Sequence, residues 1–271
     1  MKPAAFDYVR AGNLDEALAA LHEEGSDARI IAGGQSLLPM LNMRLARPQV
    51  LVDIMRLEEL RRIETKPDKI VVGAAVRQSE LLEWPQLTHE LKLVSLALPW
   101  TGHVQTRSRG TICGSIAHAD PSAEMPLVLL ALDGHILLRN ARKRRRVAAS
   151  QFFVGMMSTD RGDDEMIEAV EYPRTDGRGC AFREVARRHG DFAIVACAAV
   201  KTERGVRLAV GGVADMPIAR EFQALDGGAL DDALNAFAYD LDARDDVHAT
   251  ARYRRDLVRM IGRELIAEVL Q

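Results

Sequence analysis

The stretch RIIAGGQSLLP, from Arg29 to Pro39, constrains the fold more than any other part of the sequence. An apolar run that reads as a short buried strand passes directly into two adjacent glycines and then into polar residues. Glycine lacks a Cβ atom, so another group can approach its main chain closely, and it adopts positive φ at little cost. The pattern therefore predicts a tight turn at Gly33 and Gly34 with something packed against it.

A second glycine-containing segment lies far along the chain. Residues 107–124 read RSRGTICGSIAHADPSAE, in which Gly110 and Gly114 bracket three residues. Consecutive N–H groups in such turns can form a nest for an anion, so the two segments together could bind a diphosphate. Two ordinary turns remain the alternative, because neither segment has the Gly-Lys-Ser/Thr of a P-loop or the GxGxxG spacing of a Rossmann fingerprint.

Composition excludes several other classes. The 271 residues suffice for two domains or for one domain with subdomains, and 48% hydrophobic with 28% charged residues is ordinary for a globular protein. A net charge of −3 gives no general reason to expect nucleic-acid or membrane binding. No apolar run approaches the roughly 20 residues of a membrane span, and the first residues lack a secretory signal. We expect a cytoplasmic protein.

The cysteines limit the metal chemistry of this chain. There are three, Cys113, Cys180 and Cys197, which fits reduced thiols. Three thiolates cannot hold a four-cysteine iron–sulfur cluster, and no CxxC pair begins a zinc site. We therefore expect no metal site in this chain.

The N-terminal part reads as a βαβ-like unit of roughly 55 residues. Asn13 is a candidate helix cap with Glu16 as its capping-box partner, and Gly25 ends that helix. The unit continues with a strand at 29–32, a partly helical stretch at 37–45 and a strand at 49–54.

Further elements follow from periodicity and turn signals. In the middle part we expect strands at Ile70–Ala75, His135–Arg139 and around Val147. We expect helices there at Gln78–Leu82, Leu91–Ala97 and Asp120–Leu132. Asp120 would cap the last of these helices, with Pro121 at its first position. The turn-rich segment Pro173–Gly179 marks a boundary. Beyond it we expect strands at Phe192–Lys201 and Val206–Val213, a hairpin turn at Glu203–Gly205, and helices at Leu230–Phe237 and Val247–Leu270, the latter with Tyr253, Leu257, Ile261 and Leu265 on its apolar face.

Two motifs resemble a known family. AGGQSLLP (Ala32–Pro39) and TICGSIAHADPSAE (Thr111–Glu124) are similar to the FAD-binding medium subunit of molybdenum hydroxylases, the xanthine dehydrogenase and carbon monoxide dehydrogenase family. RPQVLVDI, VGAAVRQSELL, FREVARRHGDFAIV and GGVADMP follow in the family's order, so the resemblance covers essentially the whole chain.

The resemblance implies an α+β fold. A vanillyl-alcohol-oxidase-like (PCMH-type) FAD-binding domain would occupy residues 1–176, with subdomains at about 1–57 and 58–176. A C-terminal α+β domain of the CO dehydrogenase flavoprotein type, with three strands and helices, would occupy residues 177–271.

The resemblance also implies which residues hold FAD. The diphosphate loop would comprise Ala32, Gly33, Gly34, Gln35, Ser36 and Leu37. A second clasp would comprise Thr111, Gly114 and Ser115, with His118 nearby. Asp120 or Glu124 would accept hydrogen bonds from ribityl or ribose hydroxyls, the Ile167 backbone would meet the adenine, and Arg183 would stabilise the anionic reduced flavin. No residue here is expected to act as a catalytic acid or base.

The sequence departs from the family pattern at two positions of the second clasp. Cys113-Gly114 stands where the family has Gly-Gly, and Ser115 stands where Asn is common. Because Cys113 tolerates positive φ poorly, we expect a slightly opened turn there. No aromatic residue can be assigned to stack on the flavin.

Three functions are considered on this basis. The resemblance implies an FAD-carrying oxidoreductase subunit that passes electrons from [2Fe–2S] clusters of a small subunit to an external acceptor. A large subunit would hold the molybdenum cofactor, and the assembly would be a dimer of heterotrimers. A free-standing FAD-dependent reductase or oxidase would use Arg183, His189 and Asp191. A nucleic-acid-binding module would use Ala141–Arg146, but that run lacks interleaved aromatics and favours a solvated hairpin tip or a contact with an acidic partner.

Overall fold

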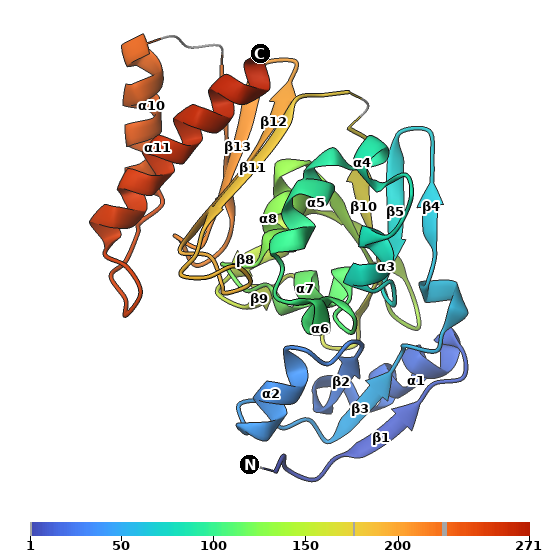
Figure 1. The fold of residues 1–271 in the computed structure, drawn as a ribbon. Helices are drawn as coiled ribbons and strands as arrows, with labels where there is room; N and C mark the ends of the chain where they lie inside the picture. The colour runs from blue at the N-terminus through green and yellow to red at the C-terminus, as the bar shows by residue number, and fades with distance from the viewer. Residues whose placement is uncertain (1, 176, 224–226) are drawn as a thin grey trace.

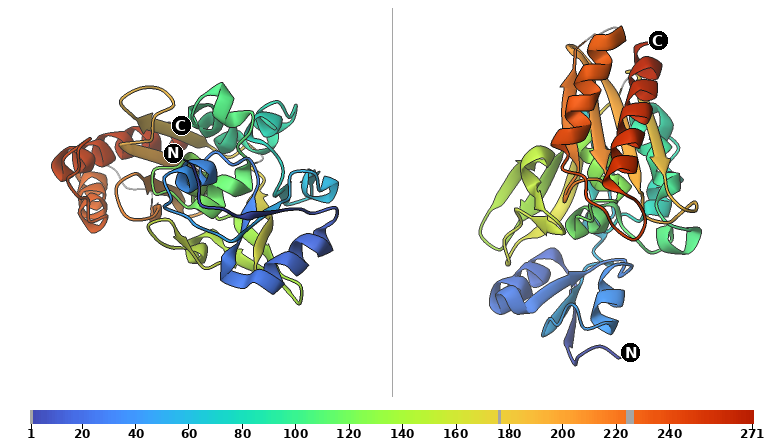
Figure 2. Two further views of the ribbon diagram at one scale, coloured as in Figure 1. Left: turned by 90° about the horizontal axis from the view of Figure 1, so that it is seen from below. Right: turned by 90° about the vertical axis from the view of Figure 1, so that its left-hand side faces the viewer.

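Three main β-sheets follow one another along the molecule, as Figure 1 shows. This computed structural model describes residues 2–175, 177–223 and 227–271. The N-terminal sheet and the C-terminal helices lie at opposite ends, with the largest sheet between them (Figure 1; Figure 2, right). The predicted α+β fold is confirmed.

The N-terminal unit is a parallel three-stranded sheet with the strand order β1-β3-β2. Its elements are β1 (Asp7–Arg10), α1 (Leu14–Glu24), η1 (Gly25–Asp27), β2 (Ala28–Ile31), α2 (Leu37–Asn42) and β3 (Val50–Asp53). The Asn13 side chain caps α1 by accepting the Glu16 N–H at 2.9 Å, and Gly25 ends the helix with a φ of 52°. The Glu16 carboxylate accepts from the Gly12 N–H rather than from that of the cap residue, so the capping box is shifted by one position. The strand β1 was not expected.

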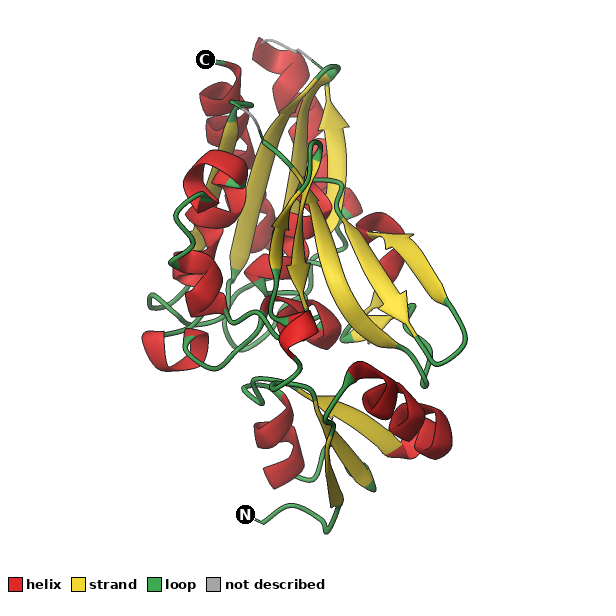
Figure 3. Ribbon diagram, turned by 90° about the vertical axis from the view of Figure 1, so that its right-hand side faces the viewer, coloured by secondary structure: helices red, strands yellow, loops and turns green. Residues whose placement is uncertain are grey.

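The middle part is an antiparallel five-stranded sheet with the order β4-β5-β10-β6-β7. Its strands are β4 (Ile63–Thr65), β5 (Lys69–Gly73), β6 (His135–Arg139), β7 (Arg144–Ala148) and β10 (Met166–Pro173). Between β7 and β10 in the sequence, β8 (Phe153–Gly155) and β9 (Ser158–Thr159) form a separate two-stranded sheet. Its helices are η2 (Glu58–Leu60), α3 (Gln78–Leu82), α4 (Leu87–Glu90), α5 (Lys92–Ala97), η3 (Leu98–Trp100), α6 (Val104–Arg107), α7 (Ile112–His118), α8 (Glu124–Ala131) and α9 (Ala149–Phe152). Figure 3 shows this sheet above the N-terminal one.

The helix expected at Asp120–Leu132 begins four residues later than predicted. Asp120 does not cap it; its carboxylate and carbonyl instead accept the N–H groups of Ser122 and Ala123 at 2.8 and 3.0 Å. These bonds close a turn of their own, so α8 starts at Glu124. A capping residue followed by proline is compatible with either arrangement, which is why the sequence pattern was ambiguous.

The C-terminal part is an antiparallel sheet of four strands, where the family resemblance implied three. It contains β11 (Cys180–Val185), β12 (Val195–Thr202), β13 (Gly205–Gly211) and β14 (Ile218–Phe222), followed by α10 (Gly227–Asp240) and α11 (Ala251–Leu270). Helices α10 and α11 cover one face, and α5 and α8 pack on the other (Figure 1).

The central strand β12 has two apolar faces, as a strand covered on both sides requires. Ala196, Ala198 and Val200 join the core that runs through the first two parts of the molecule. The alternate residues, such as Val195 and Cys197, face the core beneath α10 and α11. The two cores therefore meet at a single layer of strands.

The apolar face expected on the last helix is correct for three of its four residues. Leu257, Ile261 and Leu265 are buried, whereas Tyr253 is 46% exposed in the first turn of α11. The neighbouring Arg254 is buried instead and donates to the carbonyl oxygens of Ile194 and Gly212. In the described parts of the chain, no helix combines the length and apolar character needed to cross a bilayer.

Candidate functional site

A cavity of about 920 Å³ lies where the three parts of the molecule meet. The N-terminal unit supplies residues from 26 to 37 and 45 to 48, and the middle part supplies most of 101–124 and of 157–167. The C-terminal part contributes Gly190, Asp191 and Phe192. The size is at the upper end of the range for small-molecule and cofactor sites.

The first glycine loop packs against the second segment in this cavity. A Cβ atom placed on Gly33 would lie 2.0 Å from the carbonyl oxygen of Arg109 and 2.7 Å from the Cα of Gly110. The group that approaches Gly33 is therefore the main chain of the other segment, and no side chain fits between them. Two segments separated by about 75 residues in sequence thus meet at one point.

The turn after Gly33 presents a run of main-chain donors. Gly34 has a φ of 70°, which turns the chain toward α2. Within the described residues, no hydrogen bond engages the N–H groups of Gly34, Gln35, Ser36 and Leu37. The Gln35 side chain folds back and donates to the Gly33 carbonyl at 3.2 Å, which stiffens the turn. Successive free amides beside a left-handed residue form an anion-binding nest.

The second segment is not the glycine turn that was predicted. Thr111 forms a β-bridge with Arg77, and the chain then enters α7. The Thr111 hydroxyl caps this helix by accepting the Gly114 N–H at 2.9 Å. A Cβ atom on Gly114 would lie 2.7 Å from that hydroxyl oxygen, so glycine is needed for the cap rather than for a positive φ.

The expected disturbance at Cys113 is also wrong. Cys113 lies in the first turn of α7, is absent from the residues with positive φ, and is buried. Its Sγ donates to the Val72 carbonyl at 3.6 Å. Because a helical residue needs no left-handed conformation, cysteine fits here without opening the chain.

All the predicted site residues except Arg183 line the cavity. His118 ends α7, and its burial lowers the pKa of its imidazole. Ile167 lies on β10 beside a register shift in its pairing with β6. Arg183 points to the opposite face of β11, where its Nη2 lies 3.2 Å from Glu268 Oε2 of α11. Strand alternation places Arg183 away from the cavity, so its predicted contact with a flavin is withdrawn.

Three arginines in the cavity wall, Arg29, Arg47 and Arg161, were not expected at the site from the sequence. Arg161 precedes β10, and its Nη1 donates to the carbonyl oxygens of Gly162 and Glu165 at 2.8 and 2.7 Å. Burial and the nearby charge of Arg29 lower the pKa of Arg161. Two cations that repel each other in one wall favour an anion between or beside them. Arg29 could have been predicted at the site, because it lies on a strand that runs directly into the glycine loop.

A different part of the wall is acidic. Glu124 accepts a hydrogen bond from the Thr101 hydroxyl at 2.9 Å, and its burial raises its pKa to about 7. Asp120 lies close enough to add to that rise, and Asp191 lines the same cavity. Such a wall disfavours phosphate and suits a partner with hydroxyl groups.

A phenylalanine ring lies at the cavity. Phe192 lines it and is 67% exposed. The loop that carries Phe192 rests on the end of η3 and the segment after it: the rings of Trp100 and His189 lie 5.0 Å apart, and a Cβ atom on Gly190 would lie 2.6 Å from His103 Cε1. Phe192 is therefore presented by a supported loop and is a candidate for stacking on a bound ring.

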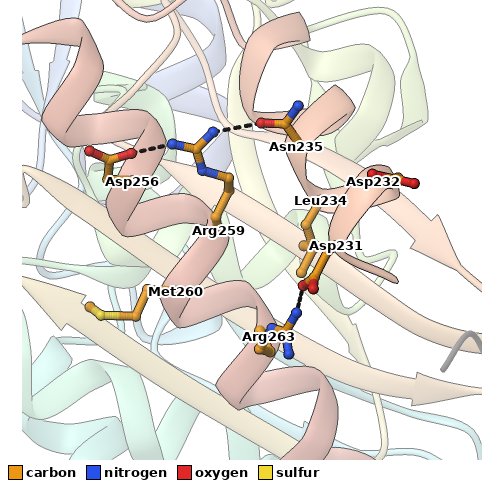
Figure 4. Close-up of a pocket in the computed structure, with 8 residues that line it drawn as sticks. All are labelled: Asp231, Asp232, Leu234, Asn235, Asp256, Arg259, Met260 and Arg263. Carbon is orange, nitrogen blue, oxygen red and sulfur yellow. Dashed lines mark hydrogen bonds and ion pairs between the residues drawn. The ribbon is translucent and has the colours of Figure 1, made fainter. Parts of the chain in front are cut away.

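A second hollow, between α10 and α11, is already occupied by its own polar groups. Figure 4 shows Arg259 bound to Asp256 and Asn235, and Arg263 bound to Asp231. The bonds of Arg259 to Asn235 and of Arg263 to Asp231 join the two helices, whereas the bond of Arg259 to Asp256 lies within α11. Among the described residues, no cluster of three or more His, Cys, Asp or Glu side chains could hold a metal ion.

Three of the five cations in the basic run at 141–146 form ion pairs within the described part of the molecule. Its last three arginines belong to β7 rather than to the tip of a hairpin. Each of them is paired with an acidic side chain: Arg144 with Glu168, Arg145 with Glu165 and Asp160, and Arg146 with Glu171. Cations engaged in this way are less available to phosphates.

Two family models match consecutive parts of the chain. The model of the FAD binding domain in molybdopterin dehydrogenase matches residues 4–175, and that of the CO dehydrogenase flavoprotein C-terminal domain matches residues 180–269. The chain belongs to this family of FAD-binding subunits.

Relatives of this flavoprotein match it over its full length. The 6-hydroxypseudooxynicotine dehydrogenase complex subunit alpha of Paenarthrobacter nicotinovorans is 37% identical, over 100% of this chain and 96% of its own. The glyceraldehyde dehydrogenase medium chain of Sulfolobus acidocaldarius is 35% identical, over 99% of this chain and 100% of its own. A solved structure of carbon monoxide dehydrogenase from Hydrogenophaga pseudoflava gives a TM-score of 0.93 at 31% identity, covering 100% and 99% of the two chains.

Proposed function

We propose that this flavoprotein is the electron-transfer subunit of a heterotrimeric molybdenum hydroxylase. Bound FAD takes up electrons singly and releases them in pairs, which suits a link between one-electron clusters and a two-electron acceptor. The [2Fe–2S] clusters would reside on a small partner subunit and the molybdenum cofactor on a large one. The assembly would be a dimer of heterotrimers.

The observation that carries this proposal is the run of free main-chain amides from Gly34 to Leu37, held against the second segment through Gly33. Amides fixed in this way can receive a diphosphate without reorganising, and Ser36 can add its hydroxyl. Thr111, Gly114 and Ser115 would form the opposite side. Ala32, Gln35 and His118 complete the set by their positions in the wall.

The charge distribution suggests how FAD lies in the cavity. Arg29 and Arg161 would attract the diphosphate side, with Ile167 beside the adenine. The carboxyl group of Asp120 or of Glu124 would accept hydrogen bonds from hydroxyls of the cofactor. Phe192, the exposed ring at the cavity, would stack on the isoalloxazine.

The oxidised substrate would be bound by another subunit. Relatives of this chain at 35–37% identity carry names that refer to 6-hydroxypseudooxynicotine, glyceraldehyde, caffeine and carbon monoxide. Proteins of such similar sequence serving such different substrates indicate that this subunit does not select the substrate.

The two alternative functions have less support. A free-standing flavin enzyme needs ionisable groups over the flavin, but of Arg183, His189 and Asp191 only Asp191 lines the cavity. A nucleic-acid-binding module needs available cations, and the arginines of β7 are paired with carboxylates.

The test is a comparison of the purified chain with the assembled complex. The chain alone should be yellow, release one FAD per polypeptide on denaturation, and keep its flavin oxidised when substrate is added. Addition of a dithionite-reduced iron–sulfur subunit, freed of excess reductant, should bleach the flavin. A colourless chain that cannot take up FAD would refute cofactor binding, and bleaching by substrate alone would favour the free-standing enzyme.

A further inference from the structure

Glu184 is a buried acid that the flavin site described above does not use. It lies on β11 with 6% of its surface exposed. Neither of its carboxylate oxygens has a hydrogen-bond partner among the described residues. An isolated carboxylate is strongly disfavoured in such surroundings, and a group of this kind usually retains its proton.

The strand directs Glu184 toward a second acid. Its neighbour Arg183 faces α11, so the alternation of β11 turns Glu184 to the other face. There its carboxyl group interacts electrostatically with that of Glu124, the first residue of α8, which lines the cavity. Burial and the charge of Glu124 raise the pKa of Glu184 to about 8.

The charged groups around Glu124 and Glu184 leave these two acids without a full counterion. Asp120 adds negative charge, and Arg107 of α6 offsets part of it. The Arg107 guanidinium, however, donates to the carbonyl oxygens of Pro99, Thr101 and Gly102 at 3.2, 3.1 and 2.8 Å.

Other charges near β11 are directed elsewhere. Lys92 of α5 acts on Cys180 at the other end of the strand. Glu264 and Glu268 of α11 lie on the opposite face, with Arg183. Ionising a buried Glu184 in the presence of a second acid carries a large penalty, so Glu184 keeps its proton.

We propose that Glu184, which is buried without a hydrogen-bond partner, holds a proton at neutral pH and that Glu124 in the cavity wall acts on it, which makes this part of the molecule a proton-binding site beside the flavin cavity. This deepens the proposed function and rests on it only where FAD is concerned. Glu124 lines the cavity and its charge acts on Glu184, so a charged molecule in the cavity can alter the protonation of Glu184. An anionic cofactor in the cavity favours the protonated form, so FAD binding should be coupled to proton uptake.

The first experiment does not involve the cofactor. Infrared spectra of the apo-chain should contain the carbonyl stretch of a protonated carboxylic acid at about pH 7, and this band should titrate away by about pH 9. Glu184→Gln should remove most of its amplitude. Glu203→Gln, at an exposed position in the turn between β12 and β13, should leave it unchanged. A wild-type chain without such a band at about pH 7 would overturn the proposal, as would an unaltered band in Glu184→Gln.

The second experiment measures the coupling. Titration calorimetry of the apo-chain with FAD at about pH 8, in buffers of different ionisation enthalpy, should reveal proton uptake by the wild type. Uptake should fall at least twofold in Glu184→Gln and stay the same in Glu203→Gln. Equal uptake in all three proteins would refute the coupling. If FAD does not bind at all, the proposed function fails, while the infrared result still decides whether the proton is present.

Discussion

Substitution of Gly33 by alanine tests the contact between the two cofactor segments directly. The new methyl group would lie 2.0 Å from the Arg109 carbonyl oxygen, whereas real Cβ atoms essentially never come closer than 3.0 Å to another heavy atom. The segments must therefore separate by at least about 1 Å. Overpacking of this kind typically lowers the free energy of unfolding by about 1–3 kcal/mol.

The same separation should weaken FAD binding. If the shift costs one hydrogen bond between an amide and the charged diphosphate, the loss is about 1.5–3 kcal/mol, or about 10- to 100-fold in Kd. We expect this loss in titrations of the apo-chain with FAD followed by flavin fluorescence, alongside urea unfolding to measure stability.

Gly228 provides a control outside the site, and Gly34 a comparison within the diphosphate loop. Gly228 lies in α10 with nothing within 4 Å of its Cβ position, so Gly228→Ala should leave FAD affinity unchanged and stability equal or higher by up to about 1 kcal/mol. Gly34→Ala would place its methyl group 3.0 Å from the movable Leu38 side chain, at a φ of 70° that costs about 1–2 kcal/mol. Wild-type affinity and stability in Gly33→Ala would refute the tight contact.

Further substitutions test the other parts of the site. Phe192→Ala should increase iodide quenching of the bound flavin's fluorescence, and unchanged quenching would argue against stacking. Arg161→Gln should raise the Kd for FAD by about tenfold at low salt and less at high salt, whereas equal effects at both would exclude an electrostatic role. Arg183→Gln should leave FAD affinity within twofold of wild type, and a larger loss would restore it to the site. Glu184→Gln should flatten the pH dependence of stability. Because the pKa of Glu184 is raised in the folded chain, the wild type should lose stability as pH rises from about 4.5 to about 8, by up to about 1.4 kcal/mol per pH unit. An unchanged profile in the variant would contradict the protonation of Glu184.

The sequence was most informative where several local signals agreed. The first helix had a cap, an apolar stripe and a terminal glycine, and α1 follows that pattern. The pattern failed where one signal fits two structures: Gly114 suggested a turn, but it serves a helix cap. Strand β1 was missed because its residues are mostly exposed and lack alternation.

The site illustrates the same limit. The glycine loop could be found because glycine reports a local main-chain requirement. Arg161 and Glu184 could not, because their importance comes from burial beside Arg29 and Glu124, which only the tertiary fold brings near. Arg183 was misplaced by a single step of strand alternation, which a resemblance between sequences does not resolve.

The two-faced strand β12 bears on how the chain can be divided. The turn-rich sequence at Pro173–Gly179 predicts a domain boundary. Ala196, Ala198 and Val200, which follow it, nevertheless belong to the same hydrophobic core as α8. A fragment ending at Thr175 would expose the apolar outer sides of α5 and α8 to water, and it should aggregate. The boundary expected from the sequence therefore does not divide the hydrophobic core.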